Sequence, residues 1–232
     1  MLDLTRIRAI SLDLDDTLWP IWPCIERAEK VLHEWLALNA PRCAELFASA
    51  EALREIRTHM NTQRPDLQHD LSALRRESIR LALTRAGEDP QLAEAAFDIF
   101  FTERQKVTFY EDVLPALDFL AARFPLVSLS NGNADLHRVG LGRYFRAAVN
   151  ARAFGVPKPD ARIFHAAAAA AGVEAHEVLH LGDDVLLDVL AARNAGMQAG
   201  WINRSESLWP AVGEPPALEC VSLTEVCTLF RD

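Results

Sequence analysis

The stretch ISLDLDDTLWP, residues 10–20, places three aspartates directly after an apolar run. Asp13, Asp15 and Asp16 occupy three of four consecutive positions there. Side chains alternate between the two sides of an extended chain, so Asp13 and Asp15 point to the same side. Carboxylates that close repel one another, and a divalent cation can offset that repulsion. The stretch therefore predicts a buried strand with an acidic site at its carboxyl end.

Two more short apolar runs also lead into polar residues. LVSLS, residues 126–130, is followed by Asn131, and VLHLG, residues 178–182, is followed by Asp183. Apolar runs that alternate with helical patterns are typical of βαβ units in a parallel sheet covered on both faces. We therefore expect an α/β core with a doubly wound, Rossmann-like parallel sheet. Further strands are expected at 147–150, 198–203 and 219–223, and helices at 115–123, 160–171 and 185–195.

The segment 19–106 breaks this alternation. Apolar residues recur there at helical spacing, and Asp89 followed by Pro90 suits the start of a helix. We therefore expect an all-helical insert at 19–106, within an α/β core formed by 1–18 and 107–232. The helices expected in the insert are 25–38, 43–59, 70–86 and 90–104.

Composition narrows the function classes. The formal net charge of the 232 residues is -9, which argues against a sequence-independent nucleic-acid binder. The four cysteines form no CxxC pair and no zinc-ligand spacing, as expected for reduced thiols. The first residues lack the apolar core of a signal peptide, and no run is long enough for a membrane span. We expect a cytoplasmic protein with neither nucleic acid nor membrane as a partner.

Four motifs occur in the order of a known superfamily. DLDDT begins at Asp13, SNGN at Ser130, VPKPD surrounds Lys158, and GDDVLLD ends at Asp188. This set resembles the haloacid dehalogenase-like (HAD) hydrolase superfamily and extends over residues 13–188. The helical insert between the first two motifs resembles the C1 cap of that superfamily. The resemblance implies a phosphomonoesterase that acts on a small phosphorylated metabolite, as a monomer or homodimer.

The resemblance also implies roles for the residues in the first motif. Asp13 would be the nucleophile that forms an aspartyl-phosphate. Asp15 would protonate the leaving oxygen and then activate the hydrolytic water. Mg²⁺ would be held by the carboxylates of Asp13 and Asp183 and by the backbone carbonyl of Asp15. Thr17 would be either a helix cap or a support for the Asp13 loop.

The other motifs would bind the phosphoryl group and support the site. Ser130 and the amides around Asn131 would hold phosphoryl oxygens, and Lys158 would supply one cation. Asp188 would be an outer partner that orients water or Lys158. Asp184 is interpreted as a helix cap.

Several alternatives bear on the reaction. Haloacid dehalogenases of the superfamily lack the second aspartate, so Asp15 disfavours a 2-haloacid dehalogenase. A phosphomutase would use the same residues and stays open on motifs alone. A catalytically silent binding protein is disfavoured because every motif residue is present.

The substrate is indicated only by likeness beyond the motifs. Two segments resemble a bacterial branch of cytosolic phosphatases that acts on flavin mononucleotide and 5-amino-6-(5-phosphoribitylamino)uracil. They are SNGNADLHRVGLGRYF and EVLHLGDDVLLDVLAARNAGMQAGWINR. A 5′-nucleotidase or a sugar-phosphate phosphatase of the same fold is the alternative. Trp19 and Trp22 are candidates to stack on a flat leaving group. His180 is expected to be a hydrogen-bonded residue of the core. The other insert candidates for substrate contact are Arg54, Arg57, Arg75 and Arg76.

Overall fold

The computed structural model describes residues 2–210 and 212–231. Contacts between Cα atoms divide the chain into two compact units. The α/β unit comprises Met1–Pro20, Thr108–Gly132 and Val139–Asp232. The helical unit comprises Ile21–Val107 and Asn133–Arg138. The backbone therefore passes from one unit to the other four times.

The α/β unit is built on a six-stranded sheet in the order β3–β2–β1–β4–β5–β6, in which every pairing is parallel. The strands β1, β2 and β4 are buried along their whole length, as their continuous apolar sequences predict. The predicted doubly wound α/β fold is confirmed. The strands are β1 (Ala9–Leu12), β2 (Leu126–Ser130), β3 (Ala147–Asn150), β4 (Val178–Gly182), β5 (Gln198–Ile202) and β6 (Glu219–Cys220).

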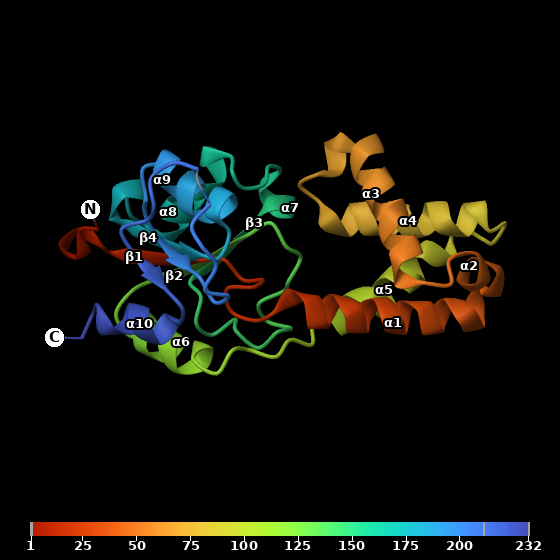
Figure 1. The fold of residues 1–232 in the computed structure, drawn as a ribbon, viewed down its shortest axis with the longest axis horizontal. Helices are drawn as coiled ribbons and strands as arrows, with labels where there is room; N and C mark the ends of the chain where they lie inside the picture. The colour runs from red at the N-terminus through yellow and green to blue at the C-terminus, as the bar shows by residue number, and fades with distance from the viewer. Residues whose placement is uncertain (1, 211, 232) are drawn as a thin grey trace. The chain divides into compact units, whose positions relative to one another are not determined.

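Helices cover both faces of this sheet. In Figure 1, α6 and α10 lie on one face, and α8 and α9 lie on the other. Ile163 and Phe164 of α8 belong to the same buried cluster as Val127 and Leu129 of β2. The helices of this unit are η1 (Leu4–Arg6), α6 (Val113–Ala121), α7 (Ala151–Phe154), α8 (Ala161–Ala171), η3 (Ala175–Glu177), η4 (Val185–Leu190), α9 (Ala191–Asn194) and α10 (Leu223–Thr228).

The sequence signals for these helices hold at most ends. The Asp160 side chain caps α8 by accepting from the Arg162 amide, as predicted. Gly196 follows α9 with a φ of +82°, a left-handed conformation that favours glycine. The helix expected over 185–195 is divided, because η4 is a wide π-helical turn and only α9 is α-helical.

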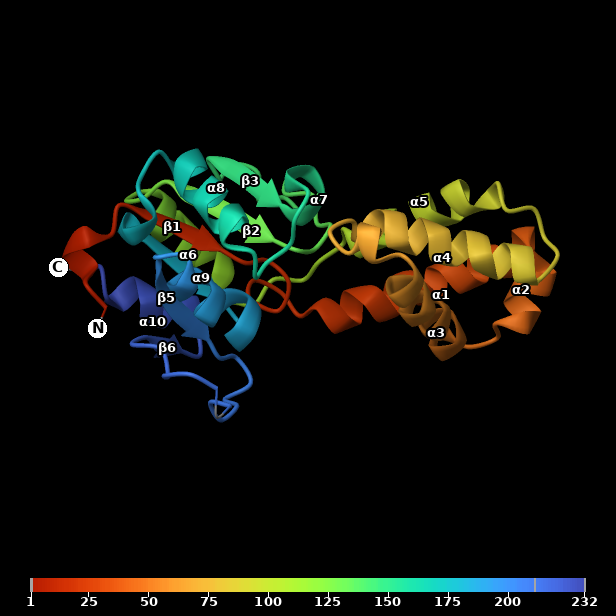
Figure 2. The same cartoon turned by 90° about the horizontal axis from the view of Figure 1, so that it is seen from above.

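The helical unit contains five α-helices among the residues that the structure describes. In Figure 2, α1, α4 and α5 run alongside one another, and their apolar faces form one buried cluster. The single helix expected over 43–59 is wrong: α2 ends at Leu46, and the Ser49 side chain caps α3. The helices are α1 (Ile21–Asn39), α2 (Pro41–Leu46), α3 (Ala50–Gln63), η2 (Pro65–Leu67), α4 (Leu71–Arg85) and α5 (Leu92–Arg104).

The short segment 133–138 completes the helical unit. The Arg104 guanidinium donates through Nε to Oδ1 of Asn133 at 2.8 Å, and Nδ2 of Asn133 donates to Ser72 Oγ at 3.1 Å. The Gln105 side chain donates to the Asn133 carbonyl at 3.3 Å and accepts from the Asp135 amide at 2.8 Å. Because Arg104 is only 1% exposed, these bonds tie the segment to the interior of the unit.

Two chain-wide observations bear on the compositional expectations. Within 2–210 and 212–231, no helix is both long and apolar enough to cross a membrane. The four cysteines are buried and free, namely Cys24, Cys43, Cys220 and Cys227.

Candidate active site

The candidate site lies at the carboxyl ends of β1, β2 and β4. Strand β1 pairs with β2 on one side and with β4 on the other, so the sheet order reverses at β1. Ligands of doubly wound sheets bind at such a reversal, beyond the carboxyl ends of the strands. Asp13 follows β1, Ser130 ends β2 and Asp183 follows β4. The Asp13 amide donates to the Leu181 carbonyl at 2.9 Å, which continues the β1–β4 pairing into the site.

Three carboxylates meet at this position. Each of Asp13, Asp183 and Asp188 has a carboxylate oxygen within 4.8 Å of the other two. Asp188 comes from η4 and reaches back toward β4, where Gly182 lies directly beside it. A Cβ at Gly182 would lie 2.3 Å from Asp188 Cγ, which no side chain allows. The glycine of the fourth motif therefore makes room for Asp188.

Lys158 is the cation of the cluster. Its Nζ donates to Asp13 Oδ1 at 2.7 Å and to Asp188 Oδ1 at 2.5 Å, and the residue is only 4% exposed. Its backbone is held by the side chain of Asn131. The Asn131 amide nitrogen donates to the Lys158 carbonyl at 3.0 Å, and Asn131 Oδ1 accepts from the Lys158 amide at 2.7 Å. The Asn131 side chain thus positions the lysine, while its backbone amide is the group predicted to bind phosphoryl oxygens.

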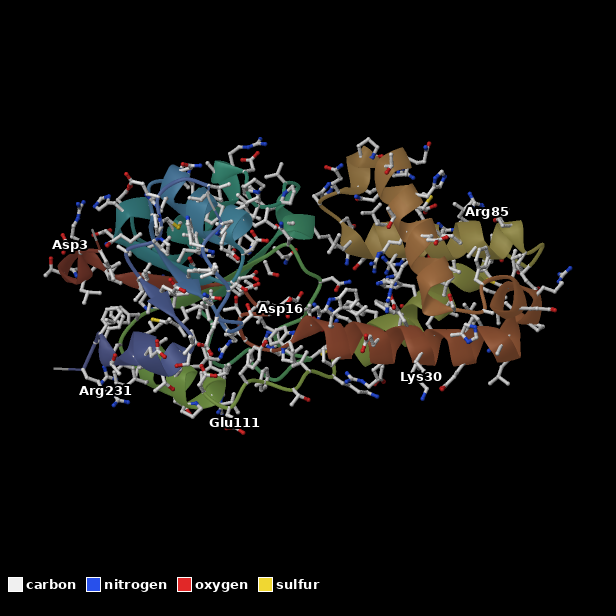
Figure 3. The ribbon with its side chains drawn as sticks, viewed as in Figure 1. Asp3, Asp16, Lys30, Arg85, Glu111 and Arg231 are labelled. Carbon is white, nitrogen blue, oxygen red and sulfur yellow. The ribbon has the colours of Figure 1, made fainter. Side chains whose placement is uncertain are left out.

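The first motif turns sharply after Asp13. Asp16, labelled in Figure 3, lies in this turn with a φ of +59°, and its amide donates to the Trp19 carbonyl at 2.8 Å. The same turn brings the Trp19 indole to Asp15, whose Oδ1 accepts from Trp19 Nε1 at 2.9 Å. Because Trp19 has no exposed surface, the prediction that it stacks on a leaving group is wrong. Trp22, in the helical unit, is 55% exposed, and the Arg54 guanidinium lies 5.1 Å from its ring.

Asp183 is fixed from two directions. Thr17 Oγ1 donates to Asp183 Oδ1 at 2.8 Å, so Thr17 supports the site and its alternative role as a cap is not needed. The indole of Trp201, on β5, donates to the Asp183 carbonyl at 2.7 Å. Asp184 accepts from the amides of Leu186 and Leu187 and caps η4, as predicted. No sequence motif indicated Trp201, because it belongs to a neighbouring strand.

The charges of the cluster are unbalanced. Burial raises the pKa of Asp13 well above its ordinary value, against the opposing effect of Lys158. Burial and the Asp188 carboxylate raise the pKa of Asp183 to about 7. Burial also acts against ionisation of Asp188, but Lys158 and His180 outweigh it and lower its pKa. Three carboxylates thus share one ammonium, and two of them hold protons more tightly than usual.

These residues fit a hard divalent cation. The possible metal ligands in the cluster are carboxylate oxygens. Mg²⁺ prefers such oxygen ligands. A cation between Asp13 and Asp183 would offset the excess negative charge that raises their pKa values. Asp188 already binds Lys158, His180 and the Asp184 amide, so it fits an outer position better than a ligand position.

The comparisons with known proteins identify the family of the chain. A family model described as haloacid dehalogenase-like hydrolase matches residues 7–196, which contain all four motifs. The chain belongs to the HAD-like hydrolase family. The resemblance drawn from the motifs is confirmed, and the chain is a hydrolase.

Two curated relatives of the chain are phosphatases. The 5-amino-6-(5-phospho-D-ribitylamino)uracil phosphatase YigB of Escherichia coli (strain K12) is 34% identical over 203 residues, 86% of this chain and 84% of YigB. The glyceraldehyde 3-phosphate phosphatase of Methanopyrus kandleri is 30% identical over 208 residues, 86% of this chain and 85% of its own length. These similarities identify the chain as a HAD-family phosphatase.

One solved HAD structure carries a different name. A protein called 2-haloacid dehalogenase, from Pseudomonas syringae pv. Tomato DC3000, superposes with a TM-score of 0.89 and 38% identity. The match covers 97% of this chain and 98% of that structure. The two names describe different reactions, hydrolysis of a phosphate ester and removal of a halogen.

Proposed function

We propose that this HAD-family phosphatase is a Mg²⁺-dependent phosphomonoesterase that works through an aspartyl-phosphate on Asp13. The observation that carries the proposal is the placement of Asp13. It is buried at the reversal of the sheet, 2.7 Å from the Lys158 ammonium, and it shares a cluster with Asp183 and Asp188. This environment combines a nucleophile, a cation for the phosphoryl group and excess negative charge for a metal to balance.

The proposed reaction has two steps, formation of the aspartyl-phosphate and its hydrolysis. In the first, an Asp13 carboxylate oxygen attacks phosphorus, the bond to the leaving oxygen breaks, and Asp15 gives that oxygen a proton. In the second, Asp15 takes a proton from water, the water oxygen attacks phosphorus, and the bond to Asp13 breaks. Lys158 and Ser130 stabilise the charge on the phosphoryl oxygens. Inorganic phosphate leaves, and both aspartates return to their starting protonation.

The bond between Trp19 and Asp15 supports the acid–base role. The Trp19 indole N–H donates to Asp15 Oδ1 and so orients the Asp15 carboxyl. In the metal site, the carboxylates of Asp13 and Asp183 and the carbonyl of Asp15 would hold Mg²⁺. When bound, the ion would lower the negative charge that a phosphate ester meets as it approaches.

We further propose a small cytoplasmic phosphate monoester as substrate, with flavin mononucleotide and 5-amino-6-(5-phosphoribitylamino)uracil as the first candidates. The similarity to YigB, which extends over 84% of that protein's length, supports the uracil compound. Flavin mononucleotide rests on the resemblance of the segments SNGNADLHRVGLGRYF and EVLHLGDDVLLDVLAARNAGMQAGWINR. Nucleoside 5′-monophosphates and sugar phosphates are the next classes to test. The helical unit would act as the C1 cap that selects among them.

A 2-haloacid dehalogenase is the second candidate, favoured by the likeness to the Pseudomonas syringae structure. Such an enzyme would use Asp13 to displace halide from carbon. Halide departs without a proton, so that reaction needs neither Asp15 nor a metal. The presence of Asp15 and the acidic cluster therefore support the phosphatase.

One experiment tests both candidates. The wild-type protein is assayed for phosphate release from the four ester classes with Mg²⁺, with EDTA, and with Mg²⁺ restored. Halide release from 2-chloropropionate is measured in parallel. Asp13→Asn should abolish phosphate release, whereas Asp118→Asn, at an exposed carboxylate on α6 of the same unit, should not. Halide release without phosphate release would overturn the proposal, and so would full phosphatase activity in EDTA.

A further inference from the structure

A line of buried side chains continues from Lys158 into the centre of the sheet. Asp188 Oδ1, which binds Lys158, also lies 3.1 Å from His180 Nε2. On the other side of the ring, His180 Nδ1 lies 2.8 Å from Ser11 Oγ. Ser11 and His180 are directly paired in the β1–β4 register, which places both side chains on one face. His180 has no exposed surface and Ser11 has 1%, so solvent does not compete for these bonds.

The direction of each bond follows from the ionised Asp188. A carboxylate only accepts, so Lys158 and His180 must both donate to its Oδ1. His180 therefore carries its proton on Nε2, which leaves Nδ1 as an acceptor for the Ser11 hydroxyl. Burial lowers the pKa of His180, which favours the neutral ring that this arrangement needs. The remaining oxygen, Asp188 Oδ2, accepts from the Asp184 amide at 3.1 Å.

An ordinary core role does not account for this choice of residue. The other residues of β1 and β4 are apolar or glycine. The ring of Phe164 packs edge-on against the His180 ring, with 5.2 Å between the ring centroids. A polar side chain gains nothing there unless it has a partner. The partner of His180 is the same carboxylate oxygen that holds Lys158. The polar pair Ser11–His180 is thus directed at one atom of the active site.

We propose that His180, oriented by Ser11, is a positioning residue that holds Asp188 so that Lys158 faces Asp13. The inference rests on the proposed phosphatase function. Two donors on Oδ1 and one on Oδ2 leave Asp188 a single orientation, and its Oδ1 then fixes the lysine ammonium. Loss of the His180 donor would let the Asp188 carboxylate rotate about its last bond. Lys158 would keep its charge but lose its fixed distance to the phosphoryl group.

The variants follow from this chain of bonds. His180→Leu removes both bonds of the ring. His180→Gln offers an amide donor near the place of Nε2, and Ser11→Ala removes only the hydroxyl that donates to Nδ1 and holds the ring from its other side. Mutating an outer hydrogen-bond partner of a metal ligand typically costs about 10- to 100-fold in metal affinity or activity. We expect a loss in kcat of about that size for His180→Leu. We expect His180→Gln to recover most of it, and Ser11→Ala to lie between His180→Leu and wild type.

The test measures kcat and KM separately on p-nitrophenyl phosphate with saturating Mg²⁺. KM should change little, because Lys158 remains present and charged. Val127→Ala, a buried truncation on the neighbouring strand β2, controls for lost stability. It should lower the melting temperature but leave kcat near wild type. Wild-type kcat in His180→Leu, or no recovery in His180→Gln, would overturn the proposal. If His180→Leu does not fold, His180→Gln and Ser11→Ala decide it by the same measurements.

A measurement without turnover separates this inference from the phosphatase function. Proton–nitrogen correlation spectra of the wild type should show His180 as the Nε2–H tautomer, and Ser11→Ala should keep that form because the Asp188 carboxylate still accepts from Nε2. A wild-type Nδ1–H tautomer would overturn the inference even if the phosphatase is fully active. An inactive wild type with the Nε2–H tautomer would instead overturn the proposed function and leave the bonding pattern intact.

Discussion

At the scale of single residues, Asp183 shows how strongly the site depends on charge. Thr17 donates a hydrogen bond that favours its carboxylate form, but burial and the Asp188 carboxylate outweigh this bond. The net effect raises the pKa of Asp183 from 3.8 to about 7 in the protein without metal. A group that carries a proton near neutral pH is a poor ligand until a cation displaces that proton. Metal binding at this site should therefore release protons.

The raised pKa of Asp183 predicts a pH dependence of stability in EDTA. Below pH 3.8 Asp183 holds its proton in both the folded and the unfolded chain, so its full contribution to the free energy of unfolding is present. As pH rises to about 7, the unfolded chain releases its proton first, and the folded state loses stability relative to it. Urea unfolding between pH 4.5 and 8 should show this loss in wild type and a smaller loss in Asp183→Asn. Equal pH slopes in the two proteins would contradict the assignment.

The acid–base role of Asp15 predicts a loss that depends on the leaving group. Asp15→Asn should lower kcat by about 100- to 10,000-fold, the usual effect of removing a positioned acid–base. The loss in the first step should be larger for an alkyl phosphate than for p-nitrophenyl phosphate, because nitrophenolate departs without a proton. Single-turnover kinetics on both esters measure this. Identical losses in the formation of the phospho-enzyme would mean that Asp15 does not protonate the leaving group.

At the scale of secondary-structure elements, η4 is the feature that completes the cluster. Its wide π-helical turn begins at the Asp184 cap and places Asp188 against β4. Such turns are rare and are frequently found at functional sites. The tight approach of Asp188 to Gly182 means that one methyl group on β4 would displace the carboxylate that binds Lys158.

Gly182→Ala should therefore damage both stability and activity. Its Cβ would meet Asp188 Cγ, Oδ2 and Cβ at 2.3, 2.4 and 2.6 Å, so η4 must move. Overpacking of this kind typically costs about 1 to 3 kcal/mol. Gly140→Ala is the matched control, because its Cβ meets nothing within 4 Å although its φ of +86° makes the change costly. Melting temperature and kcat should both fall in Gly182→Ala, and only the melting temperature in Gly140→Ala. Retained kcat in Gly182→Ala would show that Asp188 can shift without consequence.

Most of the sheet could be predicted from the sequence, because its strands are short apolar runs between helical patterns. The predicted strands 126–130 and 147–150 have the observed bounds. The strand expected over 219–223 shortens to β6, Glu219–Cys220, at the edge of the sheet. The break between α2 and α3 contains neither glycine nor proline, and only Ser49 signals it. The π-helical turn and the His180 bonds depend on pairing between distant segments, which local patterns do not reveal.

At the scale of the whole molecule, the acidic cluster should make folding stability depend on Mg²⁺. The unfolded chain separates Asp13 from Asp183 by more than 160 residues, so only the folded protein offers both carboxylates to one ion. A ligand at 100 times its dissociation constant adds about 2.7 kcal/mol. Calorimetry with increasing Mg²⁺ should show a rising melting temperature in wild type and a much weaker rise in Asp183→Ala. In EDTA, Asp183→Ala should be at least as stable as wild type, because it removes repulsion.

The segment 133–138 has a consequence for anyone who exchanges substrate-selecting regions between related enzymes. Residues 21–107 form one continuous stretch of the helical unit. The hexapeptide NADLHR, which comes later in the chain, supplies the hydrogen-bond acceptors for Arg104 and Gln105. A chimera that receives only residues 21–107 would therefore lack the segment 133–138. The buried side chains of Arg104 and Gln105 would then contact whatever residues the recipient enzyme has at these positions. A viable graft therefore needs two fragments, and the second begins three positions after Ser130 of the phosphate-binding motif.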